Sequence, residues 1–332
     1  MAIEDDRIAA VVIGRNEGEL LQPSLRSVAV ACSRAVYVDS GSSDGSPHLA
    51  RSLGFPVVEL SSDRPFSAAR GRNEGVDEAL RRWPNVEYIL FLDGDCVLER
   101  DFLPAAAGVL DGDPKCAVVT GHLVERHPEA SIYNKLCGIE WQSTPGPIKN
   151  ASLGGIMVVR VSAFRQLGGF NEQAIAGEEP DLAARLLLAG YSMMKIDQPM
   201  ATHDAQIMRF GQWWTRATRA GHAVAHRYAR HGRTELRDGR RELMSAIFWG
   251  FGLPALTIVL IWPTRGCSLL LLGGYVLLGW RMHRHYSRTG LASSDAWLVT
   301  RFILYGKFAE FIGILRYLWN RLRGQFHIIE YR

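Results

Sequence analysis

Two aspartates one residue apart, Asp93 and Asp95, carry the clearest chemical signal in the sequence. They directly follow an apolar run at residues 86–92, whose β-branched and aromatic side chains predict a buried strand of a parallel sheet. In open α/β sheets, ligands bind beyond the carboxyl ends of the strands. Carboxylates at that place suit Mg²⁺ or Mn²⁺ together with the phosphates of a nucleotide. The alternative is a loop of solvated acids, so other segments must decide.

The elements that would position these acids alternate between strand-like and helix-like patterns over the first two hundred residues. This alternation predicts parallel βαβ units with helices on both faces, and therefore an α/β fold with a Rossmann-like, mostly parallel sheet. The expected strands are residues 8–13, 35–39, 56–60, 87–92, 117–120 and 156–160, and the expected helices are residues 20–31, 46–53, 68–83, 101–110 and 181–189.

Length and composition limit the class of protein. The chain has 332 residues, of which 47% are hydrophobic and 22% are charged, so it is not wholly disordered. Its formal charge of +4 is too small to predict a nucleic-acid partner. The five cysteines have no metal-binding or redox spacing and are expected to be reduced and buried. Residues 1–7 lack the pattern of a secretory signal, so we expect the catalytic part to face the cytoplasm.

The character of the chain changes after residue 241. Two nearly uncharged runs, 245–262 and 267–280, are separated by a turn and predict a membrane hairpin at about 245–280. Arginines on both flanks place both ends in the cytoplasm. A pair of buried core helices is the alternative. Residues 297–319 are apolar but contain four charges, which favours an amphipathic helix at the headgroups over a third span.

These patterns predict two parts. The first is a cytoplasmic catalytic domain over residues 1–235, and the second is a membrane-associated helical region over residues 236–332. The location would be the inner membrane, with anionic lipids as partners of the basic C-terminal third. The sequence leaves the oligomeric state open.

Two polar turns follow the first two expected strands. Residues 14–17 include Arg15 and Glu17, and residues 39–45 are rich in glycine and serine. Small residues let the backbone approach a ligand closely. Asp39 and Asp44 offer acceptors for a ribose or a base, although a tight turn capped by these acids is the alternative.

Two further segments combine charged residues with a helix start. Residues 66–73 open a helix whose N-terminus favours an anion, and Arg70 and Asn73 share one face of it. Glu178 and Glu179 lie in a turn before another helix. One of them is a candidate general base, and the alternative is that both are ordinary helix-start acids.

The order of these segments resembles the inverting family 2 glycosyltransferases with the A-type glycosyltransferase fold. One departure is Glu179, which stands where the family usually has the catalytic Asp, and Glu178 competes with it for that role. The resemblance covers roughly residues 8–205. It rests on the nucleotide-binding turn at 38–45, the Arg-containing helix start at 69–73, the D-x-D motif at 93–95, the small acceptor-side pair at 154–155 and the acidic pair at 177–179.

The resemblance implies a displacement at the anomeric carbon of a nucleotide sugar. Asp95 would hold Mg²⁺ or Mn²⁺ against the diphosphate with help from Asp93, and Glu179 would take the acceptor proton. His203 would complete the metal shell or else lie at the surface. We assign donor binding to Arg15, Glu17, Asp39, Asp44, Arg70, Asn73, Asp93 and Arg216, and acceptor binding to Gly154, Gly155, Trp213 and Trp214.

One more helical pattern is basic. Residues Arg216, Arg219, His222, His226 and Arg230 recur at three- and four-residue steps and predict one basic helical face. It would meet the donor diphosphate or anionic headgroups, or be an ordinary solvated face.

The function expected from these features is metal-dependent transfer of a sugar to a lipid-linked saccharide in surface polysaccharide or glycolipid synthesis. The hairpin favours a lipid-linked acceptor, and the glutamate pair favours a hydroxyl that needs a base. The alternatives are a polyprenyl-phosphate glycosyltransferase and a non-catalytic nucleotide-binding membrane scaffold. A nucleotidyltransferase is disfavoured because no lysine-containing glycine-rich loop follows the first strand.

Overall fold

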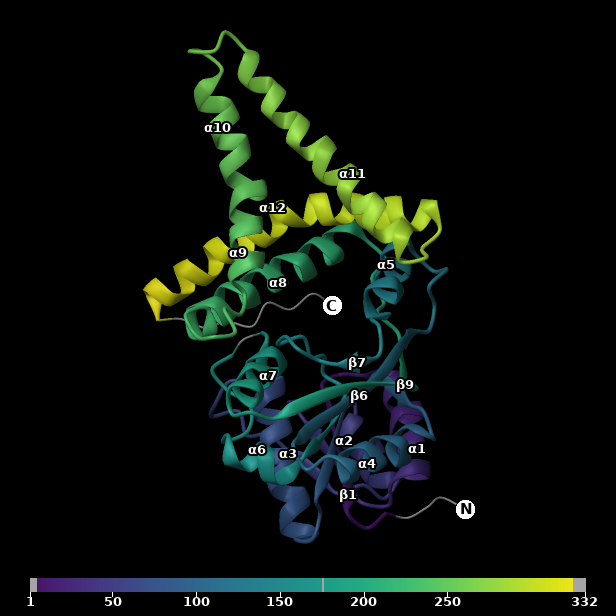
Figure 1. Cartoon of the computed structure of the whole chain (residues 1–332). Coiled ribbons are helices and arrows are strands. Elements are labelled where there is room, and N and C mark those ends of the chain that lie inside the picture. Colours follow the sequence, from purple (N-terminus) through teal and green to yellow (C-terminus); the bar gives the residue numbers. More distant parts are fainter. Residues whose placement is uncertain (1–4, 175, 325–332) are drawn as a thin grey trace. The chain divides into compact units, whose positions relative to one another are not determined.

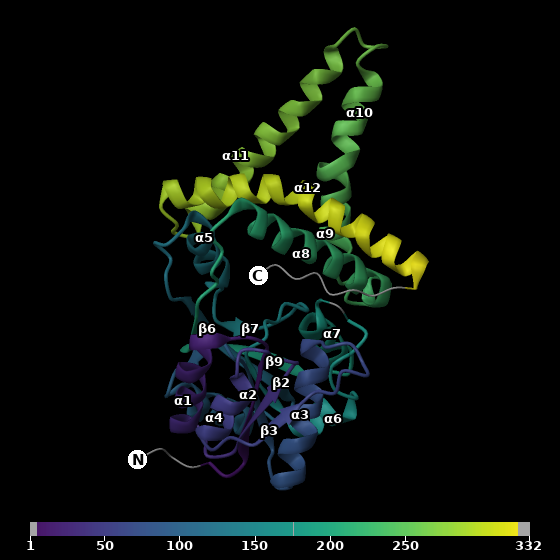
Figure 2. The same ribbon diagram turned by 180° about the vertical axis from the view of Figure 1, so that it is seen from behind.

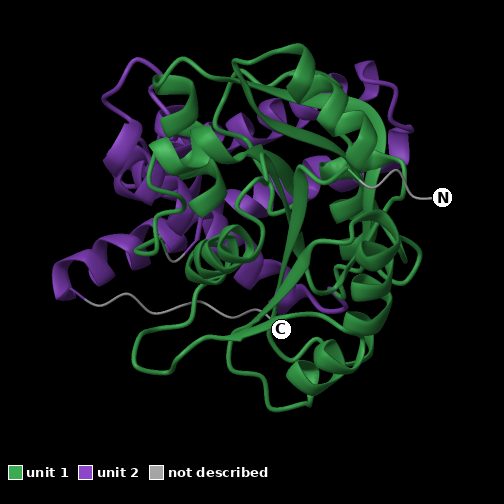
Figure 3. Cartoon of the chain, turned by 90° about the horizontal axis from the view of Figure 1, so that it is seen from below, with its two compact units in different colours: residues 1–174, 178–206 green, residues 175–177, 207–332 purple. Residues whose placement is uncertain are grey.

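The structure is a computed structural model that describes residues 5–174 and 176–324. The chain divides into two compact units (Figure 3). The first comprises Met1–Ala174 and Glu178–Gln206, and the second comprises Ile175–Gly177 and Ile207–Arg332. The division therefore comes before the expected boundary at residue 235. The reason is that the long helix α8 (Phe210–His231) packs along the C-terminal helix α12 (Ser293–Arg323) and belongs with it.

The first unit is built on one mixed sheet with the order β3-β2-β1-β4-β8-β6-β9-β5, and β7 adds to β9 (Figure 1). The pairs β3-β2, β2-β1, β1-β4 and β6-β9 are parallel, and β8, β5 and β7 pair antiparallel. The strands are β1 (Ile8–Gly14), β2 (Ala35–Asp39), β3 (Val57–Glu59), β4 (Tyr88–Asp93), β5 (Cys96–Leu98), β6 (Cys116–Glu125), β7 (Gly146–Pro147), β8 (Met157–Arg160) and β9 (Ser192–His203).

Helices cover both faces of this sheet (Figure 2), which explains the nearly continuous apolar strands β1, β2 and β4. Ala10 and Val12 pack in a core with residues of α1 and α4, whereas the neighbouring Val11 faces Gly75 of α3. The helices of this unit are α1 (Leu21–Ala31), α2 (Ser46–Ser52), α3 (Ala68–Arg82), α4 (Phe102–Gly112), α5 (Ile132–Trp141), α6 (Val161–Gln166) and α7 (Glu178–Leu188), with a short 3₁₀ turn η1 (Gly18–Leu20).

The α/β fold expected from the sequence is confirmed, with additions at one edge of the sheet. Each expected strand is present, but β5, β7 and β9 were not expected. β9 lacks a clean alternation because Asp197, Gln198 and Pro199 interrupt it, and its pairing with β6 contains register shifts. α7 begins at Glu178, so the two glutamates lie in its first turn rather than in a preceding loop.

The second unit is helical. After α8 and α9 (Arg240–Ile247), a π-helical turn η2 (Phe248–Gly252) leads into α10 (Leu253–Leu260). A turn then connects to η3 (Cys267–Leu272) and α11 (Gly273–Arg288), so that α10 and α11 form the hairpin seen in Figure 1. The C-terminal helix α12 has 31 residues and extends beyond the expected 297–319 at both ends.

Exposed apolar side chains are concentrated in this hairpin. Trp262 is 91% exposed, Leu270 82% and Val276 75%. Within the described part of the chain, one continuous helix, Arg240–Leu260, is long and apolar enough to cross a bilayer. The run at 267–280 is not long enough by itself.

The contact between α8 and α12 depends on two glycines. A Cβ on Gly221 would lie 2.1 Å from the carbonyl oxygen of Glu310, and one on Gly313 would lie 2.0 Å from that of Thr218. The helices therefore approach backbone to backbone at this crossing. His222 lies beside it, 2% exposed and packed edge-on against Tyr317 with ring centroids 5.3 Å apart.

The prediction of a basic face on α8 is wrong at His222, because this residue is buried. Burial lowers the pKa of His222, and with smaller contributions from the neighbouring His226, Arg219 and Arg316 the value falls to about 4. This imidazole is therefore neutral near pH 7 and belongs to the packed core of the second unit, although neither ring nitrogen has a hydrogen-bond partner among residues 5–174 and 176–324.

We expect Gly313→Ala to destabilise the protein. Replacing glycine by alanine in an exposed helix normally raises the free energy of unfolding by up to about 1 kcal/mol. Here the steric overlap should cost about 1–3 kcal/mol, so the net effect is a loss of stability. Denaturant unfolding of the purified protein measures the difference. Gly211→Ala on α8 is the matched control, because its Cβ would meet nothing within 4 Å. Equal stability of both variants would contradict the close crossing.

Candidate active site

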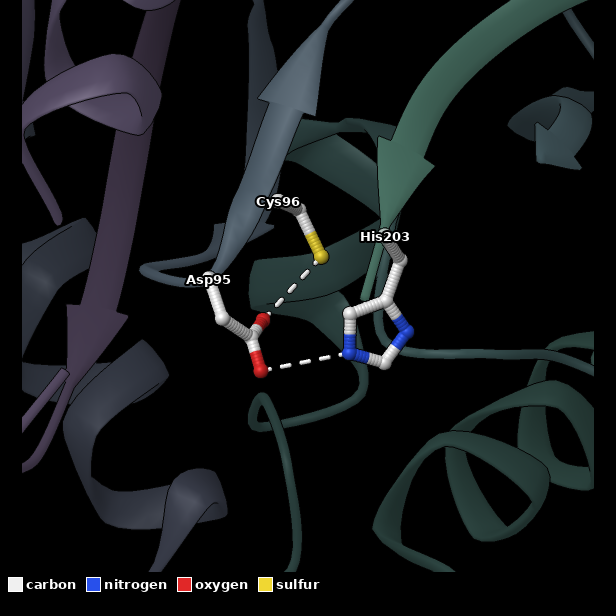
Figure 4. A group of neighbouring side chains, drawn as sticks. All are labelled: Asp95, Cys96 and His203. Carbon is white, nitrogen blue, oxygen red and sulfur yellow. Dashed lines mark hydrogen bonds and ion pairs between the residues drawn. The ribbon is translucent and has the colours of Figure 1, made fainter. Parts of the chain in front are cut away.

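The antiparallel pairing of β5 with β9 places three potential metal ligands together. Cys96 is in register with His203, and Asp95 directly precedes β5. The Asp95 carboxylate lies 3.2 Å from His203 Nε2 and accepts a hydrogen bond from the Cys96 thiol at 3.2 Å (Figure 4). The ligand atoms all lie within 4.8 Å of one another. Trp141, at the end of α5, stacks on the His203 ring with centroids 5.0 Å apart.

A second cluster surrounds Arg72 of α3, which is 2% exposed. Its Nη2 donates to Asp93 Oδ1 at 3.0 Å, and its Nη1 donates to Glu179 Oε1 at 2.9 Å and Glu178 Oε1 at 3.2 Å. Its guanidinium also lies over the Phe170 ring, 5.5 Å from the centroid. Arg72 thus joins the end of β4 to the start of α7, which are 85 or more residues apart in the sequence.

The charges of this cluster are unbalanced. One guanidinium faces three carboxylates, and the site is largely removed from water. Burial raises the pKa of Glu179, and the adjacent Glu178 raises it further, while Arg72 opposes both. A carboxylate with a raised pKa is a good proton acceptor near neutral pH. Asp93 differs, because its side chain is 39% exposed and can reach a ligand from solvent.

Gly155 provides the space for this arrangement. A Cβ there would lie 2.6 Å from Arg72 Nη2, 2.8 Å from Asp93 Oδ2 and 3.4 Å from Glu179 Oε1. A Cβ on the neighbouring Gly154 would meet nothing within 4 Å. The acceptor-side pair chosen from the sequence therefore borders the acidic cluster through Gly155.

The two acids assigned to the nucleoside lie in the turn after β2. Asp39 is 2% exposed and accepts hydrogen bonds from the backbone amides of Gly41 and Ser42 at 3.0 and 2.8 Å. Asp44 accepts from the amides of Gly18 and Ser46 at 2.9 and 3.0 Å. Both carboxylates thus hold the shape of the turn, so a direct role in donor binding stays a prediction.

This turn is also tied to the segment after β1. The amide of Asn16 donates to Ser42 Oγ at 2.9 Å, and the amide of Ser43 donates to Asn16 Oδ1 at 2.7 Å. Arg15 and Glu17 flank Asn16, and the Arg15 amide donates to the Glu17 carboxylate at 3.2 Å. The structure therefore places both predicted donor residues beside the turn of Asp39 and Asp44.

The two residues assigned to the helix start of α3 make structural contacts. Arg70 bonds Glu74 at 2.7 Å and two backbone carbonyls at 2.9 Å, so its guanidinium stabilises the preceding loop. Asn73 exchanges two hydrogen bonds of 2.9 Å with the backbone of Phe170. The residue that reaches the acids is Arg72, which was not among the predicted site residues. Its signal was a second arginine two positions after the first, on another side of the same helix.

Three predicted residues, Trp213, Trp214 and Arg216, lie on α8 in the second unit. Trp213 is 3% exposed and packs edge-on against Phe302 of α12, with centroids 4.7 Å apart. It is part of the helix packing of that unit, and the acceptor and donor roles of these three residues stay predictions.

The residues around Asp95 fit a divalent cation. A carboxylate and an imidazole are ordinary ligands of Mn²⁺, and carboxylate oxygens suit Mg²⁺. Glu125 supports the geometry, because it accepts from the backbone amide of Ala205 at 3.0 Å and so holds the chain just after His203. Cys96, which was not among the predicted site residues, offers a softer sulfur as a third possible ligand.

Comparison with known proteins finds similarity to glycosyltransferases in the first unit. Residues 10–167 match the family described as Glycosyl transferase family 2. The chain is 22% identical to the O-antigen chain rhamnosyltransferase WbaN of Salmonella anatum, over 52% of this chain and 56% of that protein. It is 30% identical to the poly-beta-1,6-N-acetyl-D-glucosamine synthase of Staphylococcus epidermidis, over 54% of this chain and 45% of that protein. The chain thus spans about half the length of these curated relatives.

Two solved structures share the fold. One is the mannosyltransferase PcManGT from Pyrobaculum calidifontis in complex with GDP-Man and Mn²⁺, with a TM-score of 0.61 at 17% identity, covering 96% of this chain and 90% of that one. The other is residues 1–349 of S. aureus TarS, with a TM-score of 0.50 at 14% identity, covering 97% and 93%.

We expect Arg72→Met to destabilise the protein by about 3–5 kcal/mol, because it leaves three acids facing one another without a buried cation. The loss should shrink as the pH falls, since protonation relieves the repulsion. Urea unfolding at pH 7.5 and pH 5 measures both effects. Arg81→Met on the exposed side of α3 is the control and should change stability little. A loss for Arg72→Met that does not depend on pH would contradict the electrostatic account.

Proposed function

Residues 10–167 match glycosyltransferase family 2, and from that match we propose that the chain transfers a sugar from a nucleotide-sugar donor to a hydroxyl of a lipid-linked saccharide at the cytoplasmic face of a membrane. The observation that carries this proposal is the buried cluster in which Arg72 joins Asp93 to Glu178 and Glu179. It combines an exposed acid that can meet a donor with a buried acid that can take up a proton.

Glu179 is the proposed general base. Its carboxylate would remove the proton of the acceptor hydroxyl as the oxygen attacks the anomeric carbon and the nucleoside diphosphate leaves. Arg72 orients this carboxylate through a 2.9 Å hydrogen bond, and its positive charge favours the ionised form of Glu179. Glu178, from the same turn of α7, raises the proton affinity of Glu179.

Mg²⁺ or Mn²⁺ is the proposed cofactor, as the structure of PcManGT with Mn²⁺ and GDP-Man suggests by analogy of fold. Asp95 and His203 would hold the ion, with Cys96 adjacent. The metal role predicted for Asp93 stays a prediction, because its carboxylate pairs with Arg72. The bound ion would supply Lewis-acid stabilisation of the diphosphate leaving group. Trp141 and Glu125 would keep His203 in position for that ligation.

The lipid-linked acceptor and membrane location are supported by the second unit. Its exposed apolar hairpin and the 21-residue helix Arg240–Leu260 are of a kind that a bilayer covers. A glutamate placed as a base favours a sugar hydroxyl over a polyprenyl phosphate, which is already ionised near neutral pH. The relatives that make O-antigen and poly-N-acetylglucosamine point to surface polysaccharide synthesis.

We expect Asp95→Asn to abolish sugar transfer and to weaken Mn²⁺ binding while the protein stays folded. The neutral amide keeps the size of the side chain but loses the charge that attracts the cation. Calorimetric titration with Mn²⁺ and release of nucleoside diphosphate from a donor panel measure the two effects. Asp197→Asn, on a side chain that is 86% exposed, is the matched control. Unchanged Mn²⁺ affinity in Asp95→Asn would refute the metal role.

We expect Glu179→Gln to lower kcat about 100- to 10,000-fold with a hydroxyl acceptor, because the base is lost. In the wild-type protein, kcat/KM should rise with pH through about 7, since only the ionised carboxylate accepts a proton. Rate measurements from pH 5.5 to 8.5 test this profile. Glu178→Gln should lower the rate less and shift the profile to lower pH, because it removes a neighbouring negative charge. A larger loss in Glu178→Gln would move the base role to that residue.

A further inference from the structure

An apolar groove of about 440 Å³ lies between α8, α9 and α12 of the second unit. This volume is within the range of about 300–1,000 Å³ that is usual for small-molecule sites. Buried side chains from all three helices form its floor. They are Ala225 of α8, Leu243 of α9, and Ile314 and Tyr317 of α12.

Two arginines complete the lining of this groove. Arg233 follows the end of α8, and Arg321 lies in the last turn of α12. Both arginines are exposed. Within the described ranges neither of them forms an ion pair, and no acidic residue lines the groove. Two guanidinium groups over an apolar floor complement a ligand that has an anionic head and a hydrocarbon body.

The charge of the surrounding unit agrees with an anionic ligand. Residues 207–332 contain 19 of the 38 Lys and Arg but 6 of the 34 Asp and Glu. The N-terminal unit has the opposite balance, with 19 basic and 28 acidic residues. The excess positive charge is therefore confined to the unit that contains the groove.

The groove lies at the start of the candidate membrane helix. Leu243 and Ile247, in the first turns of the helix Arg240–Leu260, line it. At 1.5 Å per residue this helix is about 31 Å long, the thickness of a hydrocarbon core. If the helix crosses the bilayer, its first turns and the groove lie at the level of the lipid headgroups.

We propose that this groove binds one anionic phospholipid of the bilayer, with its phosphate between Arg233 and Arg321 and an acyl chain along Leu243, Ile314 and Tyr317. This inference rests on the membrane association in the proposed function and adds a structural lipid to it. Basic pockets between helices at the cytoplasmic side are a known way to hold such headgroups. The lipid would stabilise the packing of α8, α9 and α12 in the membrane.

Native mass spectrometry of the full chain, released from micelles containing phosphatidylglycerol or phosphatidylcholine with the same acyl chains, tests the proposal. We expect one phosphatidylglycerol to stay bound in preference to phosphatidylcholine. Arg233→Gln/Arg321→Gln should lower that preference about 30-fold, from the usual contribution of two basic residues near an anionic lipid. Both residues are exposed, so the variant should fold, which circular dichroism checks.

Arg240→Gln/Arg241→Gln is the matched control. These arginines are exposed at the start of the candidate membrane helix Arg240–Leu260 and do not line the groove, and their replacement removes the same amount of charge.

Ala229→Trp fills the groove from its exposed rim and should also lower lipid retention. If both arginine double variants lose the preference for phosphatidylglycerol equally, general surface charge explains the binding and the proposed site in the groove is wrong. A lipid-free dimer that Arg233→Gln/Arg321→Gln abolishes would assign the groove to a second copy and also overturn the proposal.

The test is separate from the proposed membrane association. Sedimentation with phosphatidylcholine vesicles reports on the apolar hairpin alone, whereas the lipid preference reports on the groove. If the protein fails to sediment with vesicles, the membrane location is wrong. If it sediments but shows no preference for phosphatidylglycerol, the lipid site alone is wrong.

Discussion

The ion-pair cluster of Arg72 is the interaction on which the site depends. A buried guanidinium is costly unless carboxylates surround it, and buried carboxylates are equally costly without it. Asp93, Glu178 and Glu179 come from distant parts of the chain, and the fold brings all three carboxylates to Arg72. These contacts tie the end of β4 to the start of α7, and Arg72 opposes the rise in the pKa of Glu179 that burial and Glu178 cause.

The antiparallel pairing at one edge of the sheet positions the candidate metal ligands. A purely parallel sheet would carry the chain away after Asp93, because each strand is followed by a helix. Here the chain turns at Gly94 into the short β5, which pairs antiparallel with β9. This pairing puts His203 next to Asp95, 108 residues away in the sequence. The departure from parallel pairing is therefore what assembles the proposed ligand set.

The sequence predicted the parallel core and the acids, but not the residues that connect them. Strands β1, β2 and β4 are continuous apolar runs, so their period and length identify them. β9 is interrupted by polar residues and Pro199, and a local pattern could not reveal it. Arg70 and Arg72 look alike in sequence, and only the facing direction of α3 against the sheet decides which one reaches the acids. Such a choice depends on tertiary packing.

The opposite charges of the two units agree with the different surroundings proposed for them. An acidic unit suits a site that holds a cation, because carboxylates are its ligands and the excess charge attracts it. A basic helical unit with exposed apolar residues suits a bilayer that carries anionic headgroups. The near-neutral total of +4 hides this division, since the net charge of −9 on the first unit offsets most of the +13 on the second. Net charge is therefore informative here for each unit separately. The basic unit combines a close backbone crossing at Gly221 and Gly313 with an ion pair between Arg227 and Asp238.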